Sequence, residues 1–140
     1  MKNVVAVMIL SLFGCNASAQ IADPFLVGSW KYLRTFQYVH VDEQDRVFQC
    51  QISPDLHVFF STGTYQEGGV IEWEVPRFFS LYGQEMPSGR DWGTSTMELR
   101  TRVMFLTMPT ASGQSTERLE FDKVPVLPTI CAHYLALAFE

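Results

Sequence analysis

The 140-residue sequence predicts an all-β domain, built as an antiparallel barrel or sandwich. About seven or eight short segments with alternating apolar and polar residues follow one another at spacings of about ten residues. A turn signal rich in glycine, proline, serine or aspartate separates most of them. The chain also contains 11 phenylalanines, 5 tyrosines and 3 tryptophans, large side chains that suit a curved sheet.

The first 19 residues predict a signal peptide. Lys2 supplies a positive charge, and residues 4–13 form an apolar run that is too short for a membrane anchor but typical of a signal sequence. Ala17 and Ala19 offer the small side chains that a signal peptidase requires. We therefore place cleavage after Ala19 and expect a periplasmic or secreted protein.

A competing interpretation is a lipoprotein. Residues 12–15 resemble a bacterial lipobox that ends at Cys15, although the bulky Phe13 departs from its usual pattern. Only lipidation at Cys15 would attach the protein to the envelope membrane. Otherwise residues 20–25 are a short N-terminal extension, and residues 26–140 form the domain.

Charge argues against nucleic acid as a partner. Without Lys2, nine scattered lysines and arginines stand against 15 aspartates and glutamates, so the exported chain has a net charge of −6. Phosphate binding needs a basic patch, and the sequence shows none.

The opening segment, residues 26–38, predicts one long strand. From Trp30, aromatic and long side chains recur at every second position and would lie on one face. Alternation also predicts strands over residues 47–52, 56–60, 65–67, 70–75 and 77–82.

Two of these predictions rest on local detail. In residues 47–52, Phe48, Cys50 and Ile52 share one side while two glutamines share the other, as in a half-buried strand. Residues 61–64 contain Gly63 and predict a tight turn that makes a hairpin of the segments on either side.

The second half of the chain continues the pattern after a long loop. Residues 83–96 collect glycine, proline, serine and aspartate, and long loops of this kind often carry function. Alternation predicts one strand over residues 97–108 and another over residues 117–124. Residues 129–139 fit a short helix or a strand, and we favour the helix because they are rich in alanine and leucine.

Two cysteines remain after export, Cys50 and Cys131. An even number in an oxidising compartment favours a disulfide between them. The alternative is two separately buried thiols.

Several short motifs resemble lipocalins and small bacterial lipocalin-like domains. Gly28-Ser29-Trp30 resembles the Gly-x-Trp signature of lipocalins. Residues 59–65 with 71–73 are similar to the strand–turn–strand of the bacterial domains, and residues 97–106 lie where those domains place two further strands. The resemblance spans about residues 26–124.

The resemblance implies a single antiparallel up-and-down β-barrel. In true lipocalins an arginine covers the tryptophan, and Arg118 is the candidate here. A bond between Cys50 and Cys131 would pin the C-terminal tail to the barrel wall.

No catalytic or metal-binding motif accompanies these features. His40, His57 and His133 each lack a second histidine at metal-ligand spacing, and we expect no metal and no cofactor. Cys131 and His133 would point to opposite faces of a strand, which disfavours a nucleophile–base pair.

The aromatic surplus supplies the functional hypothesis. Large aromatic residues either fill the barrel or line a pocket for an apolar ligand, and the pocket candidates are Trp30, Phe36, Tyr38, Phe60 and Trp73. We therefore expect an exported, non-enzymatic binding protein for a small hydrophobic ligand. The alternative is an envelope protein-binding module, such as an inhibitor or immunity-type partner, that acts through its acidic surface and residues 83–96.

Export makes a direct prediction about the N-terminus. Intact-mass and peptide analysis of protein from a bacterial envelope fraction should find a chain that begins at Gln20. A diacylated Cys15 would instead establish the lipoprotein alternative.

Overall fold

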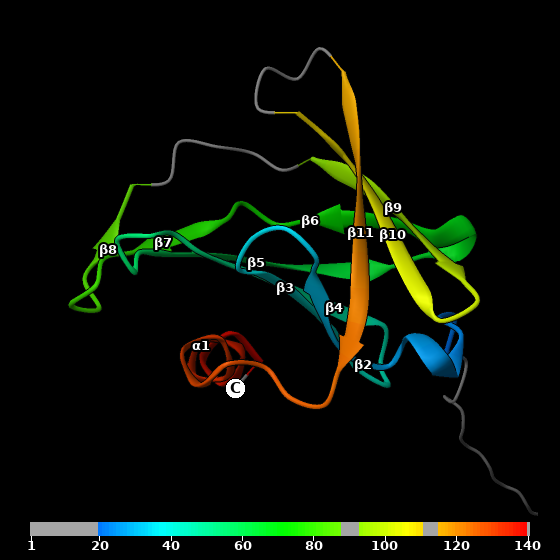
Figure 1. The fold of residues 1–140 in the computed structure, drawn as a ribbon, viewed down its shortest axis with the longest axis horizontal. Coiled ribbons are helices and arrows are strands. Elements are labelled where there is room, and N and C mark those ends of the chain that lie inside the picture. The colour runs from blue at the N-terminus through cyan, green and yellow to red at the C-terminus, as the bar shows by residue number, and fades with distance from the viewer. Residues whose placement is uncertain (1–19, 88–92, 111–114, 140) are drawn as a thin grey trace, which may run out of the picture.

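A computed structural model describes residues 20–87, 93–110 and 115–139 (Figure 1). The predicted signal peptide, including Cys15, lies outside these residues. No helix among them is long and apolar enough to cross a membrane.

Eight strands of the described chain close into an antiparallel barrel. In barrel order they are β2 (Gly28–Tyr32), β3 (Gln37–Val41), β4 (Arg46–Ile52), β5 (Val58–Tyr65), β6 (Val70–Trp73), β9 (Thr94–Arg100), β10 (Val103–Pro109) and β11 (Thr116–Val124). Each strand pairs with its neighbours in this order, and β11 returns to β2. This order confirms the predicted up-and-down barrel.

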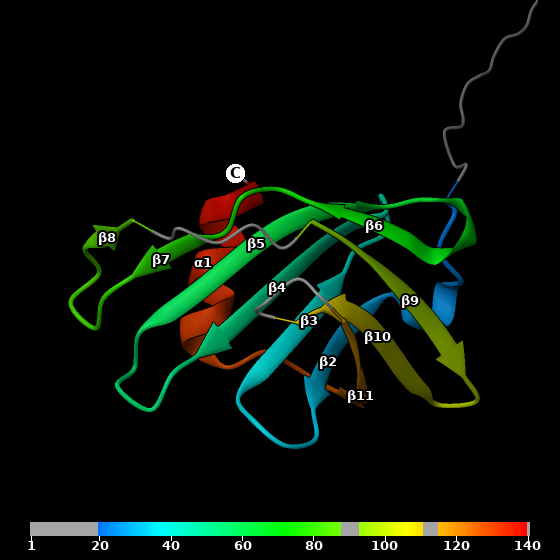
Figure 2. The ribbon, with the colours of Figure 1, turned by 90° about the horizontal axis from the view of Figure 1, so that it is seen from above.

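The sheet also extends beyond the barrel. Along one edge of β5, residues 58–60 pair with β7 (Arg77–Phe79) and residues 63–65 pair with β6. The strand β7 in turn pairs with β8 (Glu85–Met86). Because β6 pairs onward with β9 whereas β7 pairs with β8, the sheet divides at residues 74–76. Figure 2 shows β7 and β8 projecting past the end of the barrel.

The helix α1 (Thr129–Phe139) lies against the outer face of the sheet (Figure 1). This confirms the predicted C-terminal helix. The Cys50–Cys131 disulfide joins β4 to α1, and both cysteines are fully buried. Closing a loop across this separation of 81 residues contributes about 4 kcal/mol if the bond acts on the entropy of the unfolded chain.

Two hydrophobic cores result. The barrel core lies inside the closed strands, and the helix core lies between the outer sheet face and α1. The main members of the barrel core are Leu26, Trp30, Val39, Val41, Val47, Ile71, Trp73, Met104, Leu106 and Phe121. Those of the helix core are Tyr38, Phe48, Cys50, Val58, Phe60, Phe79, Cys131 and Tyr134.

The N-terminal segment closes one end of the barrel, which we call the floor. Ala22 and Leu26 belong to the barrel core, and the indole nitrogen of Trp30 donates to the Leu26 carbonyl at 3.0 Å. The Asp45 carboxylate accepts hydrogen bonds from the backbone nitrogens of Ile21 and Ala22, at 2.8 and 2.9 Å. The segment predicted as an extension thus forms part of the floor.

Lys123 covers the floor from β11. Its ammonium lies 5.0 Å from the Trp30 ring centroid and donates to the carbonyls of Phe25 and, at 2.8 Å, Val27. Gly28 has a φ of +131°, and a side chain there would meet the Lys123 Cε at 2.9 Å. The positive φ favours glycine at this position, whereas the end of the flexible lysine side chain could shift to admit a larger residue.

The resemblance assigned this covering role to Arg118, and that assignment is wrong. Arg118 lies on the outer surface, 3.9 Å from the Phe105 ring centroid, and pairs with Glu98 at 3.2 Å. Along β11, odd-numbered Leu119 and Phe121 are buried in the barrel core, so alternation directs Arg118 outward and Lys123 inward.

Residues 26–38 are not one strand. The chain turns at residues 33–36, and β2 and β3 form a hairpin in which Trp30 is paired with Val39. An extended segment of 13 residues would reach about 43 Å, longer than a small barrel can use. Alternation continues through the turn and therefore did not reveal it.

Residues 61–64 are not a turn. They lie within β5, where Gly63 is opposite Trp73 and a side chain would come within 2.6 Å of the Glu72 carbonyl oxygen. Glycine is needed here because two strands approach closely, and not because the backbone adopts a positive φ.

Residues 97–108 are also not a single strand. The chain reverses at Thr101 and Arg102, between β9 and β10, as the resemblance implied. Thr101 adopts a φ of +59° without the glycine or asparagine that normally signals such a turn.

The predicted loop at residues 83–96 contains β8 and the start of β9, while residues 88–92 lie outside the described chain.

The floor makes a testable prediction. Trp30 is fully buried, so Trp30→Ala should cost about 3–5 kcal/mol of unfolding free energy, out of about 5–15 kcal/mol for such a domain. Phe36→Ala, at a side chain that is 61% exposed, should cost less than about 1 kcal/mol. Urea denaturation measures both, and similar costs would show that the floor is not the organising element.

Candidate ligand site at the barrel mouth

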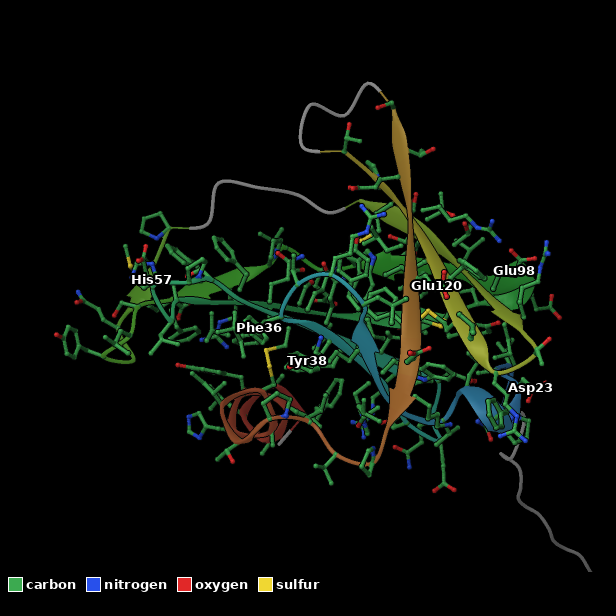
Figure 3. All side chains as sticks on the ribbon, in the orientation of Figure 1. Asp23, Phe36, Tyr38, His57, Glu98 and Glu120 are labelled. Carbon is green, nitrogen blue, oxygen red and sulfur yellow. A yellow bond between two sulfur atoms is a disulfide. The ribbon has the colours of Figure 1, made fainter. Side chains whose placement is uncertain are left out.

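The five predicted ligand-binding residues do not gather at one site. Trp30 and Trp73 lie in the barrel core, and Tyr38 and Phe60 lie in the helix core on the opposite face of the wall. Phe36 is exposed in the turn between β2 and β3 (Figure 3). The division follows from the hairpin, which separates Trp30 from Phe36 and Tyr38, and from the period of two along each strand.

Near the floor, the interior of the barrel is filled by side chains of its own strands. Trp30, Met104, Leu106 and Phe121 are all fully buried there, as expected for the interior of a small barrel. The end of the barrel opposite the floor, which we call the mouth, carries a pocket.

A pocket of about 150 Å³ lies at the mouth, beside the start of β3 and the end of β4. It is lined by Thr35, Phe36, Gln37, Gln51, Ile52, Ser53 and Phe59. None of these side chains carries a charge. We take this mouth pocket as the candidate site.

Three glutamine side chains meet inside the barrel next to this pocket. The amide nitrogens of Gln37 and Gln51 both donate to the side-chain oxygen of Gln49, at 2.8 and 3.0 Å. Gln49 is fully buried, and its own nitrogen lies 3.7 Å from the sulfur of Met108. The cluster thus uses the Gln49 oxygen as a shared acceptor.

Two acceptors of the cluster remain unused. Within the described chain, no donor reaches the side-chain oxygen of Gln37 or of Gln51. Gln37 is only 7% exposed, yet neither oxygen is completely sealed from solvent. Both residues line the pocket, so a molecule that enters it can contact their side chains.

The cost of leaving such groups unpaired favours a polar contact. A polar group held away from water without a partner costs about 1–3 kcal/mol. An occupant that is purely apolar would impose this cost on both glutamines, whereas one that donates hydrogen bonds would avoid it. The pocket therefore selects for donors.

Aromatic rings form the other wall of the mouth. Phe59 stacks on Phe78 with ring centroids 4.1 Å apart and planes 13° from parallel. His57 meets Phe78 edge-on, with ring centroids 5.4 Å apart. Together with exposed Phe36, these rings give the mouth an apolar surface beside the glutamines.

The histidines occupy separate places. His40 Nδ1 is 2.9 Å from the Ser29 hydroxyl on the outer face, and burial lowers the pKa of His40 despite an opposing attraction from Asp42. His133 packs edge-on against Tyr134. Among the described residues, no group of three or more His, Cys, Asp or Glu side chains could hold a metal ion.

Alternation alone did not reveal the glutamine cluster, because it does not show which side of the strand faces the barrel interior. Phe48 and Cys50 are indeed buried, but they face α1 on the outside, while Gln49 points into the barrel. The available signal was the recurrence of Gln37, Gln49 and Gln51 at strand positions of matching parity.

Comparison of the chain with protein-family models, with curated proteins and with solved structures finds no match in any of the three.

The shared acceptor makes a prediction about stability. Gln49→Leu removes the partner of two amide nitrogens and should cost about 1–3 kcal/mol in urea denaturation. Replacing Gln37, Gln49 and Gln51 together by leucine should cost less than three separate losses, because no amide is then left unpaired.

The matched control is Gln44→Leu at an exposed position, where the change should stay within about 0.5 kcal/mol. If Gln49→Leu behaves like this control, the cluster does not form in solution.

Proposed function

We propose that the protein is a non-enzymatic binding protein that holds a small ligand at the mouth of its barrel. The observation that carries this proposal is that Gln37 and Gln51, whose side-chain oxygens accept no hydrogen bond within the described chain, line an uncharged pocket beside phenylalanine rings. Ligand sites typically combine an apolar surface with a few convergent polar groups.

The volume of the pocket limits what it can enclose. About 150 Å³ is half of the roughly 300 Å³ at the lower end of ligand pockets, so the mouth encloses one ring or one short group. A larger ligand would extend into solvent. The absence of charged side chains from the lining favours a neutral group, because an unpaired ion is costly to bury.

The hydrophobic ligand expected from the aromatic residues is thereby revised in part. Phe36 and Phe59 offer apolar contact, but the deep interior that a long apolar ligand would occupy is filled by Trp30 and Phe121. The ligand is therefore apolar on one side and carries hydrogen-bond donors on the other.

Kinship with lipocalin-like domains is part of the proposal. The meander of eight strands, the floor of Gly28 and Trp30 under Lys123, and the outer helix support it. The Cys50–Cys131 disulfide supports a periplasmic or secreted location, because disulfides persist in oxidising compartments. Attachment through a lipidated Cys15 is the alternative location.

An envelope protein is the second candidate partner. Within the described chain, β8 ends the sheet order and has no strand on its outer side, and nearby Tyr82 is 92% exposed. Edge strands of this kind can accept an extended segment of a partner. Residues 83–87 would then belong to the interface.

A fragment screen tests the small-ligand proposal. Neutral ring compounds are added to 15N-labelled protein, and the side-chain amide signals of Gln37, Gln49 and Gln51 are followed by NMR. We expect binders to shift these three signals while the exposed Gln44 amide stays in place. Binding only at β8, or no shift at the mouth, would contradict the proposal.

A further inference from the structure

We propose that the group held in the mouth pocket is a neutral polyhydroxylated ring, that is, one sugar unit. This inference rests on the proposed function and specifies its ligand class. It follows from the kind of polar atom left free, the charge around the pocket and the shape of its apolar wall.

The free polar atoms of the cluster are acceptors that come as a pair. Gln37 and Gln51 are direct cross-strand partners on β3 and β4. Side chains at such positions start about 4.5–5.5 Å apart, so their two oxygens can meet donors on one small molecule. Neighbouring hydroxyl groups on a ring supply two donors at a short and fixed separation.

The pocket also supplies donors. The Ser53 hydroxyl oxygen accepts a hydrogen bond from the His57 backbone nitrogen at 3.1 Å, which leaves its hydrogen free to donate. The Thr35 hydroxyl lines the same pocket. A ligand that both donates and accepts is therefore favoured over one that only donates, and hydroxyl groups do both.

Charge excludes an ammonium as the source of the donors. No carboxylate lines the pocket, and the Lys31 ammonium lies 5.7 Å from the centroid of the Phe36 ring, which does line it. A cationic ligand would be repelled by this lysine and would find no counter-ion. The donors must belong to a neutral molecule.

The aromatic wall calls for a rigid ligand with an apolar face. The ring of Phe36 is 61% exposed at the mouth, and Phe59 is held by its stack on Phe78. Aromatic faces carry partial negative charge, which attracts the C–H groups on the face of a sugar ring. A linear polyol has no such face, and a plain hydrocarbon ring has no donors.

The test compares matched ring compounds on the full exported chain, residues 20–140. Methyl glycosides of glucose, galactose, mannose and N-acetylglucosamine, with myo-inositol, are titrated and the glutamine side-chain amides are followed by 15N NMR. Cyclohexanol and methylcyclohexane serve as rings with one hydroxyl and with none. We expect saturable shifts with at least one polyhydroxylated ring, and affinity at least about tenfold weaker for cyclohexanol.

Variants assign the binding to the pocket. Gln37→Leu combined with Gln51→Leu should weaken the sugar by about tenfold or more, and Phe36→Ala should weaken it by a smaller factor. Gln44→Leu should bind as the parent does. A thermal melt of each variant without ligand shows that the change in binding does not come from unfolding.

The outcomes separate this inference from the proposal beneath it. If cyclohexanol or methylcyclohexane binds at the mouth as well as any sugar, the mouth is a ligand site but the sugar assignment is overturned. If no ring compound shifts the three glutamine amides, both the sugar assignment and the proposed mouth site fail. Sugar binding that is unchanged in the double leucine variant also overturns the assignment.

Discussion

The alternation of side chains along β4 is the constraint on which the rest of the structure depends. Both faces of this strand are buried, because one faces the barrel interior and the other faces α1. Consecutive residues therefore belong to different environments: Gln49 joins the glutamine cluster, and Cys50 joins the disulfide to the helix. A shift of one residue in register would place the cysteine in the barrel and the glutamine against an apolar helix, so the two features reinforce a single register.

The division of the sheet beside β5 sets where a ligand can bind. At the floor end β5 pairs with β6 and the barrel closes through β9, whereas at the other end β5 pairs with β7 and the sheet opens outward. Gly63 permits the tight packing on the closed side. The open side carries the stacked Phe59 and Phe78, so the mouth has an aromatic wall that a fully closed barrel would have enclosed.

The two ends of the barrel differ in how their polar side chains are bonded. At the floor, Trp30, Lys123 and Asp45 bond to the N-terminal segment, while the buried side-chain nitrogen of Gln20 has no partner among the described residues. At the mouth, the side-chain oxygens of Gln37 and Gln51 accept no hydrogen bond from the described residues. Both residues line the pocket at the mouth, where a ligand can reach their side chains.

The sequence by itself determined the all-β class and favoured both the Cys50–Cys131 disulfide and a helical tail, because period-two alternation, composition and cysteine count are local signals. The Gly28–Trp30 floor was indicated by the resemblance to lipocalins. Tertiary structure decided the rest. Turns at residues 33–36 and at Thr101 lack strong local markers, and only barrel closure requires them. The sequence also showed that Gln49 and Phe48 point to opposite sides of the strand. Alternation cannot distinguish the barrel interior from the outer face here, because α1 covers the outer face and apolar residues are buried there as well. The candidate site was therefore hidden in residues whose polarity suggested solvent, and it became visible only when the barrel brought three glutamines together.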